Sequence, residues 1–184
     1  MQATGEGFTG GYKKPDPFQA IWDDPARVAQ SLYVHERFMV RPDDSPVVPH
    51  HLLVIARREL ALEALPLNEY LAMWALARLL FAHMTAVLAP KRKVSMQVWG
   101  NQVQTAHIHL VPRNNPEDAT VWKPMGLSGE ALETQLAETR RLLTFPSGLK
   151  VQADQLVDEA LKLLAGTTLP PVLPTLPISG KKQQ

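Results

Sequence analysis

One apolar segment constrains the fold of this 184-residue chain more than any other feature. After Pro66 the sequence reads LNEYLAMWALARLLFAHMTAVLA and then reaches Pro90, which predicts a helix of roughly six turns. Its length also suits a membrane span, but Arg78 and His83 lie inside it, and an unpaired arginine at a membrane centre costs about 3 kcal/mol. Apolar residues cover most of its circumference. We therefore predict a core helix that lies against a sheet, and no membrane as a partner.

Short segments on both sides of this helix predict the strands of that sheet. Residues 30–41, QSLYVHERFMVR, contain two apolar runs around a turn-like His-Glu-Arg, which is typical of a β-hairpin. Residues 51–56, HLLVIA, have the composition of a central strand that is covered on both faces. Residues 93–99 alternate polar and apolar side chains, as a strand with one wet face does. Residues 105–111 form the next predicted strand, closed by Pro112.

The two ends of the chain differ in composition from this predicted core. Residues 1–17 are rich in glycine and proline and have no apolar repeat, which predicts a flexible leader and not a secretory signal. We predict a core domain over residues 18–127 and a helical C-terminal extension over residues 128–168, where Ser128 could cap the first of two amphipathic helices. Residues 169–184 are proline-rich and then basic, as in an extended or disordered tail.

Charge and cysteine content narrow the classes of function. The chain has 19 Lys and Arg against 18 Asp and Glu, a formal net charge of +1, and no cysteine. This balance gives no field strong enough to favour nucleic acid as the main partner, although a local phosphate site is compatible with it. The lack of cysteine excludes a disulfide framework, a thiolate zinc site and a cysteine nucleophile. We predict a cytoplasmic protein.

Two histidines occupy an unusual position within a predicted strand. His107 and His109 lie two residues apart in TAHIHLV, so both rings project from one face while Ile108 and Leu110 point toward the core. The pair could be solvated surface residues, or could hold zinc with His51 as a third ligand. A third interpretation is catalytic, because a neutral imidazole attacks phosphorus while a protonated neighbour gives its proton to the departing oxygen. A histidine pKa of about 6.5 makes both forms available near neutrality.

Two distant segments resemble the histidine triad (HIT) family of nucleotide hydrolases and transferases. The run QTAHIHLVPR, preceded by SMQ at residues 95–97, resembles the family signature His-x-His-x-His followed by two apolar residues. Residues 43–58, DDSPVVPHHLLVIARR, resemble an earlier Pro-x-x-Pro-Gly-His-x-Leu-Val-x-Pro segment of the family. Aligning on the apolar pair puts Thr105, His107 and His109 at the triad positions, so threonine replaces the first histidine. The other register, with His107 first, leaves valine at the third position.

The resemblance covers residues 18–113 and implies an α+β fold, with an antiparallel sheet of about five strands and one long helix, often in a homodimer. It implies that His107 attacks the α-phosphorus of a nucleotide to give a nucleotidyl-histidine intermediate, which water hydrolyses. His109 would assist the leaving group, and His51 would fix the rings through hydrogen bonds. His50, beside it, stands where the family has a small residue.

Further positions match substrate contacts of the family. Asp43 would accept hydrogen bonds from ribose hydroxyls, and Gln97 would donate to a phosphate oxygen. Phe18 and Ile21 would border the base pocket. Thr105 can form a hydrogen bond there but cannot carry the charge of an imidazole.

The implied reaction is cleavage of a nucleoside monophosphate from a dinucleoside polyphosphate or a nucleotide phosphoramidate. Two alternatives remain open at this stage, a nucleotidyl transferase or phosphorylase on the same substrates and a nucleotide-binding module with little turnover. We expect no metal or cofactor bound by the protein itself, although Mg²⁺ could accompany the substrate.

Overall fold

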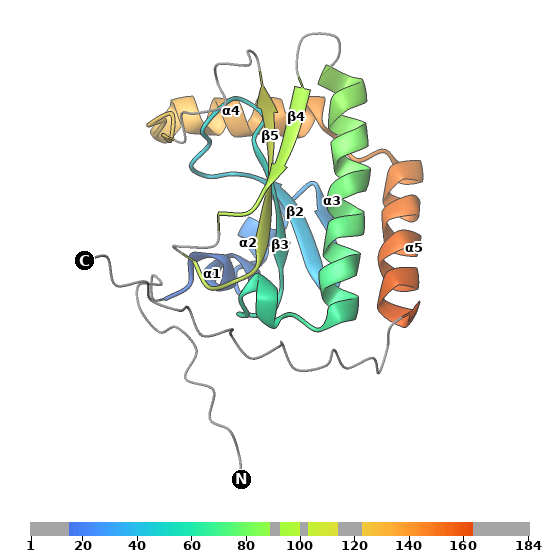
Figure 1. Cartoon of the computed structure of the whole chain (residues 1–184). Coiled ribbons are helices and arrows are strands. Elements are labelled where there is room, and N and C mark those ends of the chain that lie inside the picture. Colours follow the sequence, from blue (N-terminus) through green and yellow to red (C-terminus); the bar gives the residue numbers. More distant parts are fainter. Residues whose placement is uncertain (1–14, 89–92, 100–102, 114–122, 164–184) are drawn as a thin grey trace, which may run out of the picture.

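The computed structural model describes residues 15–88, 93–99, 103–113 and 123–163, and its centre is a five-stranded sheet (Figure 1). The strands are β1 (Tyr33–Val34), β2 (Phe38–Pro42), β3 (Leu52–Ala56), β4 (Lys93–Gln97) and β5 (His107–Arg113). Their order in the sheet is β1-β2-β3-β5-β4, and every neighbouring pair is antiparallel. The hairpin predicted for residues 30–41 is confirmed, as is the α+β class.

The long helix α3 (Leu67–Leu88) packs against one face of the sheet, as predicted (Figure 1). Its buried residues recur three or four positions apart and pack with core residues of the strands. On another side α3 packs against α5 (Ser147–Leu163). By length and composition α3 could also cross a membrane. Cover by a sheet and by a second helix accounts for the apolar circumference of α3 without a bilayer.

The predicted C-terminal extension contains two helices, and it completes the core instead of standing apart from it. Helix α4 (Gly129–Leu142) lies across one end of the sheet, and Leu143, Ala153 and Val157 are fully buried in the same apolar cluster as the strands (Figure 1). Ser128 precedes α4 but makes no capping hydrogen bond, so that prediction is wrong. The next residue, Gly129, has a left-handed φ of 55°, and the backbone there departs from the geometry of a capped turn.

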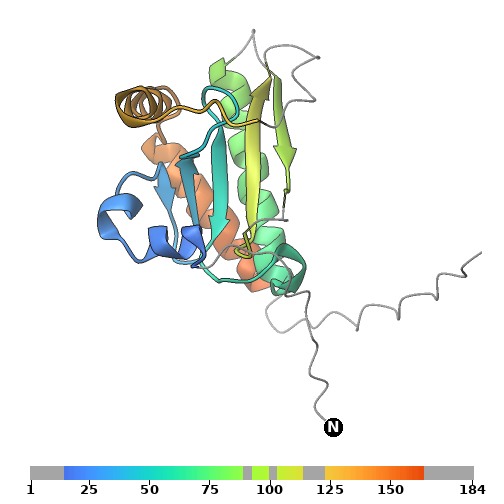
Figure 2. The same ribbon diagram turned by 90° about the vertical axis from the view of Figure 1, so that its left-hand side faces the viewer.

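The opposite face of the sheet carries two short helices, α1 (Pro17–Trp22) and α2 (Pro25–Val28) (Figure 2). The folded part begins before the leader boundary predicted at residue 17, because Asp16 is buried and caps α1 by accepting from the Phe18 N–H. Residues 1–14 of the predicted leader and the predicted tail at residues 169–184 lie outside the described residues.

Strand β5 runs through Pro112 to Arg113 and does not close before it, contrary to the prediction. Pairing of β5 with β3 ends at Leu110, so Pro112 has a strand partner on one side only, at Val94 of β4. A proline without an N–H is tolerated at such a position. The alternation along β5 is as predicted: Ile108 and Leu110 belong to the core cluster on the α3 side.

Candidate active site

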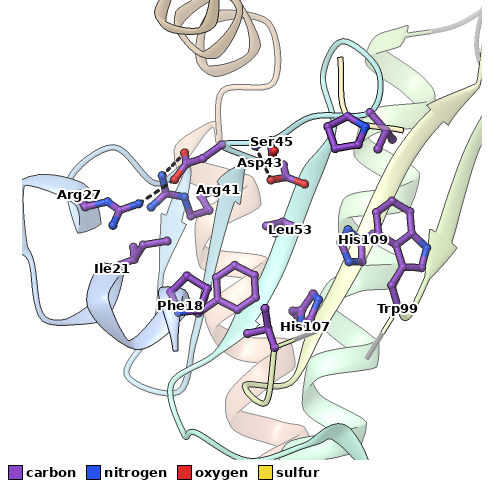
Figure 3. A pocket seen from close by; sticks show the side chains of 15 residues that line it. Phe18, Ile21, Arg27, Arg41, Asp43, Ser45, Leu53, Trp99, His107 and His109 are labelled. Atoms are coloured by element: carbon purple, nitrogen blue, oxygen red, sulfur yellow. Dashed lines mark hydrogen bonds and ion pairs between the residues drawn. The ribbon is translucent and has the colours of Figure 1, made fainter. Parts of the chain in front are cut away.

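A cavity of about 760 Å³ lies between β5 and the short helices on the face opposite α3 (Figure 3). It is lined by five of the predicted site residues, namely Phe18, Ile21, Asp43, His107 and His109. Residues that are as far apart in the sequence as Phe18 and His109 therefore meet at one place. The other three predicted residues, His51, Gln97 and Thr105, are not part of this lining.

His51 links two lining residues in a buried hydrogen-bonded chain. Its Nδ1 lies 3.1 Å from Asp43 Oδ2, and its Nε2 lies 3.0 Å from His109 Nδ1. Because an ionised carboxylate only accepts, His51 Nδ1 carries the hydrogen and its Nε2 accepts one from His109 Nδ1. The Val47 N–H lies farther from His51 Nδ1, at 3.4 Å. His109 Nε2 is then left without a hydrogen, and it has no hydrogen-bond partner within the part of the chain that is described.

Asp43, His51 and His109 are also close enough to hold a metal ion, since one ligand atom from each lies within 4.8 Å of the others. Both ring nitrogens of His51 are already engaged, one by the carboxylate and one by the second ring. An ion would have to replace at least one of these hydrogen bonds. The chain of hydrogen bonds accounts for the observed geometry, and the absence of a resident metal stays a prediction.

Burial keeps the histidine rings uncharged. It lowers the pKa of His51 to about 3 and that of His109 to about 2, and neighbouring rings lower both further. Burial also lowers the pKa of His107, against an opposing effect of its hydrogen bond to the Thr105 carbonyl. Burial raises the pKa of Asp43 to about 6. At pH 7 the three rings are therefore neutral and Asp43 is mostly ionised.

We expect the protein to lose stability as the pH falls below about 6.5. An unfolded histidine has a pKa of 6.5, whereas folded His51 and His109 titrate near 3 and 2, so the unfolded chain binds more protons over this window. The stability from both rings is present above pH 6.5 and is lost as the pH falls. The raised pKa of Asp43 acts in the opposite sense, with stability that is present below about pH 3.8 and lost as the pH rises through about 6.

The two histidines take up protons on unfolding and the one carboxylate releases one, which leaves a net uptake of about one proton. The free energy of unfolding should therefore fall by about 1.4 kcal/mol per pH unit. Urea unfolding midpoints at pH 7, 5.5 and 4.5 measure the effect. A midpoint that does not change between these pH values would contradict the burial of neutral rings.

His107 is oriented by the main chain. Its Nδ1 lies 2.8 Å from the carbonyl oxygen of Thr105. A carbonyl only accepts, so Nδ1 carries the hydrogen and Nε2 keeps its lone pair, which is the nucleophilic form of a neutral imidazole. The ring of Phe18 meets His107 edge-on, with 4.8 Å between ring centroids, and the His107 and His109 rings are also 4.8 Å apart. The side chain at the first triad position is therefore not what holds His107.

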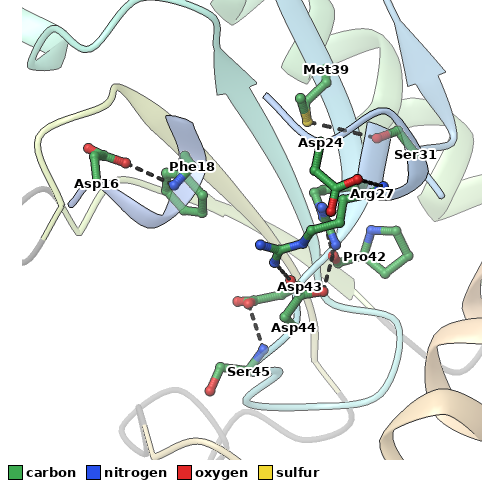
Figure 4. Close-up of polar contacts among 11 residues, drawn as sticks. Asp16, Phe18, Asp24, Arg27, Ser31, Met39, Pro42, Asp43, Asp44 and Ser45 are labelled. Carbon is green, nitrogen blue, oxygen red and sulfur yellow. Dashed lines mark hydrogen bonds and ion pairs between the residues drawn. The ribbon is translucent and has the colours of Figure 1, made fainter. Parts of the chain in front are cut away.

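Helix α1 fixes Thr105 on two sides. Gln19 Nε2 donates to Thr105 Oγ1 at 3.0 Å, and Asp16 Oδ2 accepts from the Thr105 N–H at 2.9 Å. The other oxygen of Asp16 accepts from the Phe18 N–H at 2.8 Å (Figure 4). The sequence interpretation missed Asp16 and Gln19. The Asp-Pro pair at residues 16–17, an N-cap followed by a proline at the first helical position, was the available signal for the start of α1.

Gln97 supports an aromatic ring and does not line the cavity. Its Oε1 accepts from the indole N–H of Trp99 at 2.9 Å. Trp99 in turn stacks on His109, with 3.8 Å between ring centroids and 24° between the planes. The described contact of Gln97 thus acts on His109 through Trp99, a residue that the sequence interpretation missed.

The C-terminal extension supports the loop that carries Asp43 and His51. His50 has a φ of 67°, in the left-handed region that favours glycine. Its Nδ1 lies 3.2 Å from Thr139 Oγ1 of α4. From the segment just before the extension, the Met125 N–H also donates to the Pro46 carbonyl at 2.8 Å. Contacts from α4 and from this preceding segment therefore hold the loop where His51 reaches His109.

Comparisons with known proteins bear on the family and on the fold. A family model described as "HIT domain" matches residues 26–116. The chain is similar in structure to a Hit-like protein involved in cell-cycle regulation from Bartonella henselae, with 16% identity and a TM-score of 0.51 over 72% of this chain and 97% of that one. A HIT family protein from Bacillus anthracis matches with 21% identity and a TM-score of 0.48 over 70% of this chain and 96% of that one. A search of curated proteins finds no match.

Proposed function

Because this chain belongs to the histidine triad family, we propose that it cleaves a nucleoside monophosphate from a dinucleoside polyphosphate or a nucleotide phosphoramidate. One observation carries the proposal. His107 and His109 line the same cavity, and the Nδ1 of each ring is engaged in a hydrogen bond. This arrangement leaves the Nε2 of both rings for the reacting phosphate.

In the proposed first step, the lone pair of His107 Nε2 attacks the α-phosphorus. A phosphorus–nitrogen bond forms while the bond from phosphorus to the leaving oxygen or nitrogen breaks, and the bonding pair departs with the leaving group. In the second step water attacks the same phosphorus and gives one proton to His109 Nε2, which the first step left without one. The phosphorus–nitrogen bond breaks, the nucleoside monophosphate leaves, and His107 returns to its neutral form.

His109 would supply the proton for the leaving group. Its ring is neutral in the unliganded protein, but a bound phosphate carries negative charge, and an opposite charge nearby raises a histidine pKa. A proton taken up at Nε2 on substrate binding gives an imidazolium. Its Nδ1–H donates to His51, whose Nδ1–H donates to the Asp43 carboxylate, so the new charge is stabilised along the chain.

The remaining lining residues fit a nucleoside. Asp43 Oδ1 accepts from the Ser45 N–H at 2.8 Å, and a carboxylate has further lone pairs for ribose hydroxyls. Phe18, Ile21 and Leu53 offer apolar surface for a base. A homodimer, a cytoplasmic location and Mg²⁺ arriving with the substrate stay predictions.

The test is to trap the intermediate. We expect wild-type protein mixed with diadenosine polyphosphate or adenosine phosphoramidate to gain the mass of one adenylyl group, and peptide mapping to place it on His107. Binding by calorimetry without any product or adduct would contradict the proposal and favour a binding module. An adduct on His109 would overturn the assignment of roles.

We expect Asp16→Ala to lower kcat by about tenfold or more, and Thr105→Val by less than about threefold. Asp16 holds the N–H of Thr105, the residue whose carbonyl orients His107, whereas the Thr105 hydroxyl contacts Gln19. The alanine also leaves the buried Thr105 N–H unpaired, which costs about 1–3 kcal/mol of stability. Steady-state kinetics and thermal unfolding measure both effects.

Asp24 provides a matched control, because it caps α2 before a proline as Asp16 caps α1, and its capping bonds are local. Asp24→Ala should cost stability but leave kcat nearly unchanged. If Thr105→Val proves as inactive as Asp16→Ala, then the hydroxyl itself is required and the main-chain account is wrong.

A further inference from the structure

One end of the cavity is lined by charged side chains that the proposed reaction does not use. Arg27, Arg41 and Asp44 line it, and Figure 3 shows Arg27 and Arg41 near Ile21, at the end of the cavity away from His107. Asp44 Oδ2 accepts from Arg27 Nη2 at 2.9 Å, and Asp44 Oδ1 accepts from Arg41 Nη2 at 2.7 Å (Figure 4). One carboxylate therefore joins two guanidinium groups and leaves a local charge of +1.

These side chains carry more donors than acceptors. Each guanidinium has five N–H donors and no acceptor, and Asp44 takes one donor from each. Arg41 is 3% exposed, and its Nη1 has no hydrogen-bond partner among the described residues. Arg27 is partly exposed, and its N–H groups other than the one bonded to Asp44 can donate to a ligand. Unsatisfied buried donors are costly, and a ligand with an acceptor at this end would relieve that cost.

This end of the cavity is where the edge of a nucleobase would lie. With the phosphate at His107 and the ribose at Asp43, a base packed on Phe18 and Ile21 extends toward the two arginines. Apolar surface holds any base by its faces. The hydrogen-bonding groups at the far edge decide which base is preferred.

Resting on the proposed function, we propose that Arg27, Arg41 and Asp44 select a purine with a carbonyl oxygen at position six, as in inosine and guanosine nucleotides, over adenine. The carbonyl accepts from a guanidinium in a charge-assisted hydrogen bond. The N–H at position one of such a base meets Asp44, whose oxygens keep further lone pairs. In the same pose adenine presents an amine donor at position six to the guanidinium donors and an acceptor nitrogen at position one to the Asp44 carboxylate, so both contacts are mismatched.

Inosine 5′-monophosphate and adenosine 5′-monophosphate are the sharpest pair of probes, because they differ only in the groups at positions one and six of the base. In calorimetry with the full chain we expect the inosine nucleotide to bind about tenfold more tightly, which is about 1.4 kcal/mol. Guanosine 5′-monophosphate should behave like the inosine nucleotide.

Arg27→Met should reduce the tenfold ratio to less than about threefold, because methionine keeps apolar contact but donates nothing. The loss of positive charge weakens the binding of both nucleotides equally through their phosphate groups. A change in the ratio of the two affinities therefore reports on the base alone. Arg141→Met is the matched control, since Arg141 is exposed on α4 and outside the lining, and the ratio should stay near tenfold. Circular dichroism checks that both variants are folded.

Equal affinity for the inosine and adenosine nucleotides would overturn this inference, as would a preference that Arg27→Met leaves unchanged. In both cases an adduct on His107 would leave the proposed function standing. Failure of all three monophosphates to bind, together with no adduct, would overturn both proposals.

Discussion

Replacing His107 with alanine is expected to lower kcat for hydrolysis of adenosine phosphoramidate by at least about a thousandfold, or about 4 kcal/mol of barrier. The substitution removes the nitrogen that forms the bond to phosphorus. His109 cannot take over, because its stacking on Trp99 holds the ring away from the position that His107 occupies. Rapid-mixing kinetics with product separation measure the rate, and intact mass should show no adenylyl adduct.

The matched control is His83→Ala, a histidine on α3 that contacts Phe145 on the far side of the sheet. This variant should keep the wild-type kcat. Binding of adenosine monophosphate to His107→Ala should survive within about threefold, since ribose and base contacts remain. Equal turnover by wild type and His107→Ala would show that product forms without a covalent intermediate on this residue.

The regular part of the fold could be predicted from the sequence because its signals are local. The alternation in TAHIHLV puts His107 and His109 on one face, and the apolar segment after Pro66 has the length of one helix. Resemblance to a family then placed Asp43 and His51 near the two rings. The position of His51 between Asp43 and His109 agrees with that interpretation.

The rest of the site could not be predicted, because its contacts join distant positions that carry no local pattern. Asp16 reaches Thr105 across 89 residues, and His50 reaches Thr139 across another 89. Such pairs satisfy polar groups that become buried only once the sheet has formed. The threonine at the first triad position looked like a missing catalytic part. In the folded chain, its carbonyl and the helix that holds it orient His107.

The contact of Gln97 shows a second reason why part of the site could not be predicted. From the sequence alone, an amide on an alternating strand next to His109 could equally contact a phosphate oxygen or a neighbouring side chain. The choice depends on Trp99, which follows the end of β4 and turns its indole N–H toward Gln97. The same indole stacks on His109, with 3.8 Å between ring centroids. No property of Gln97 itself encodes this.

The role of His109 predicts a loss that depends on the leaving group. We expect His109→Ala to lower kcat by about 10²–10³-fold for a phosphoramidate with an alkylamine leaving group, which must take up a proton to depart. For a nucleoside p-nitrophenyl phosphate the loss should be less than about tenfold, because p-nitrophenolate leaves as a stable anion. The ratio of the two losses in kcat measures the contribution of proton donation to the leaving group, since any disturbance of His107 affects both substrates alike.

His51→Ala distinguishes donation of the proton from stabilisation of the charge. Without His51, the His109 imidazolium loses its partner at Nδ1 and its link to Asp43. The same dependence on the leaving group should appear, with a smaller loss of about tenfold for the alkylamine substrate. Losses of equal size for both leaving groups in His109→Ala would show that His109 positions the phosphate, and the proton would then have to come from solvent through the open side of the cavity.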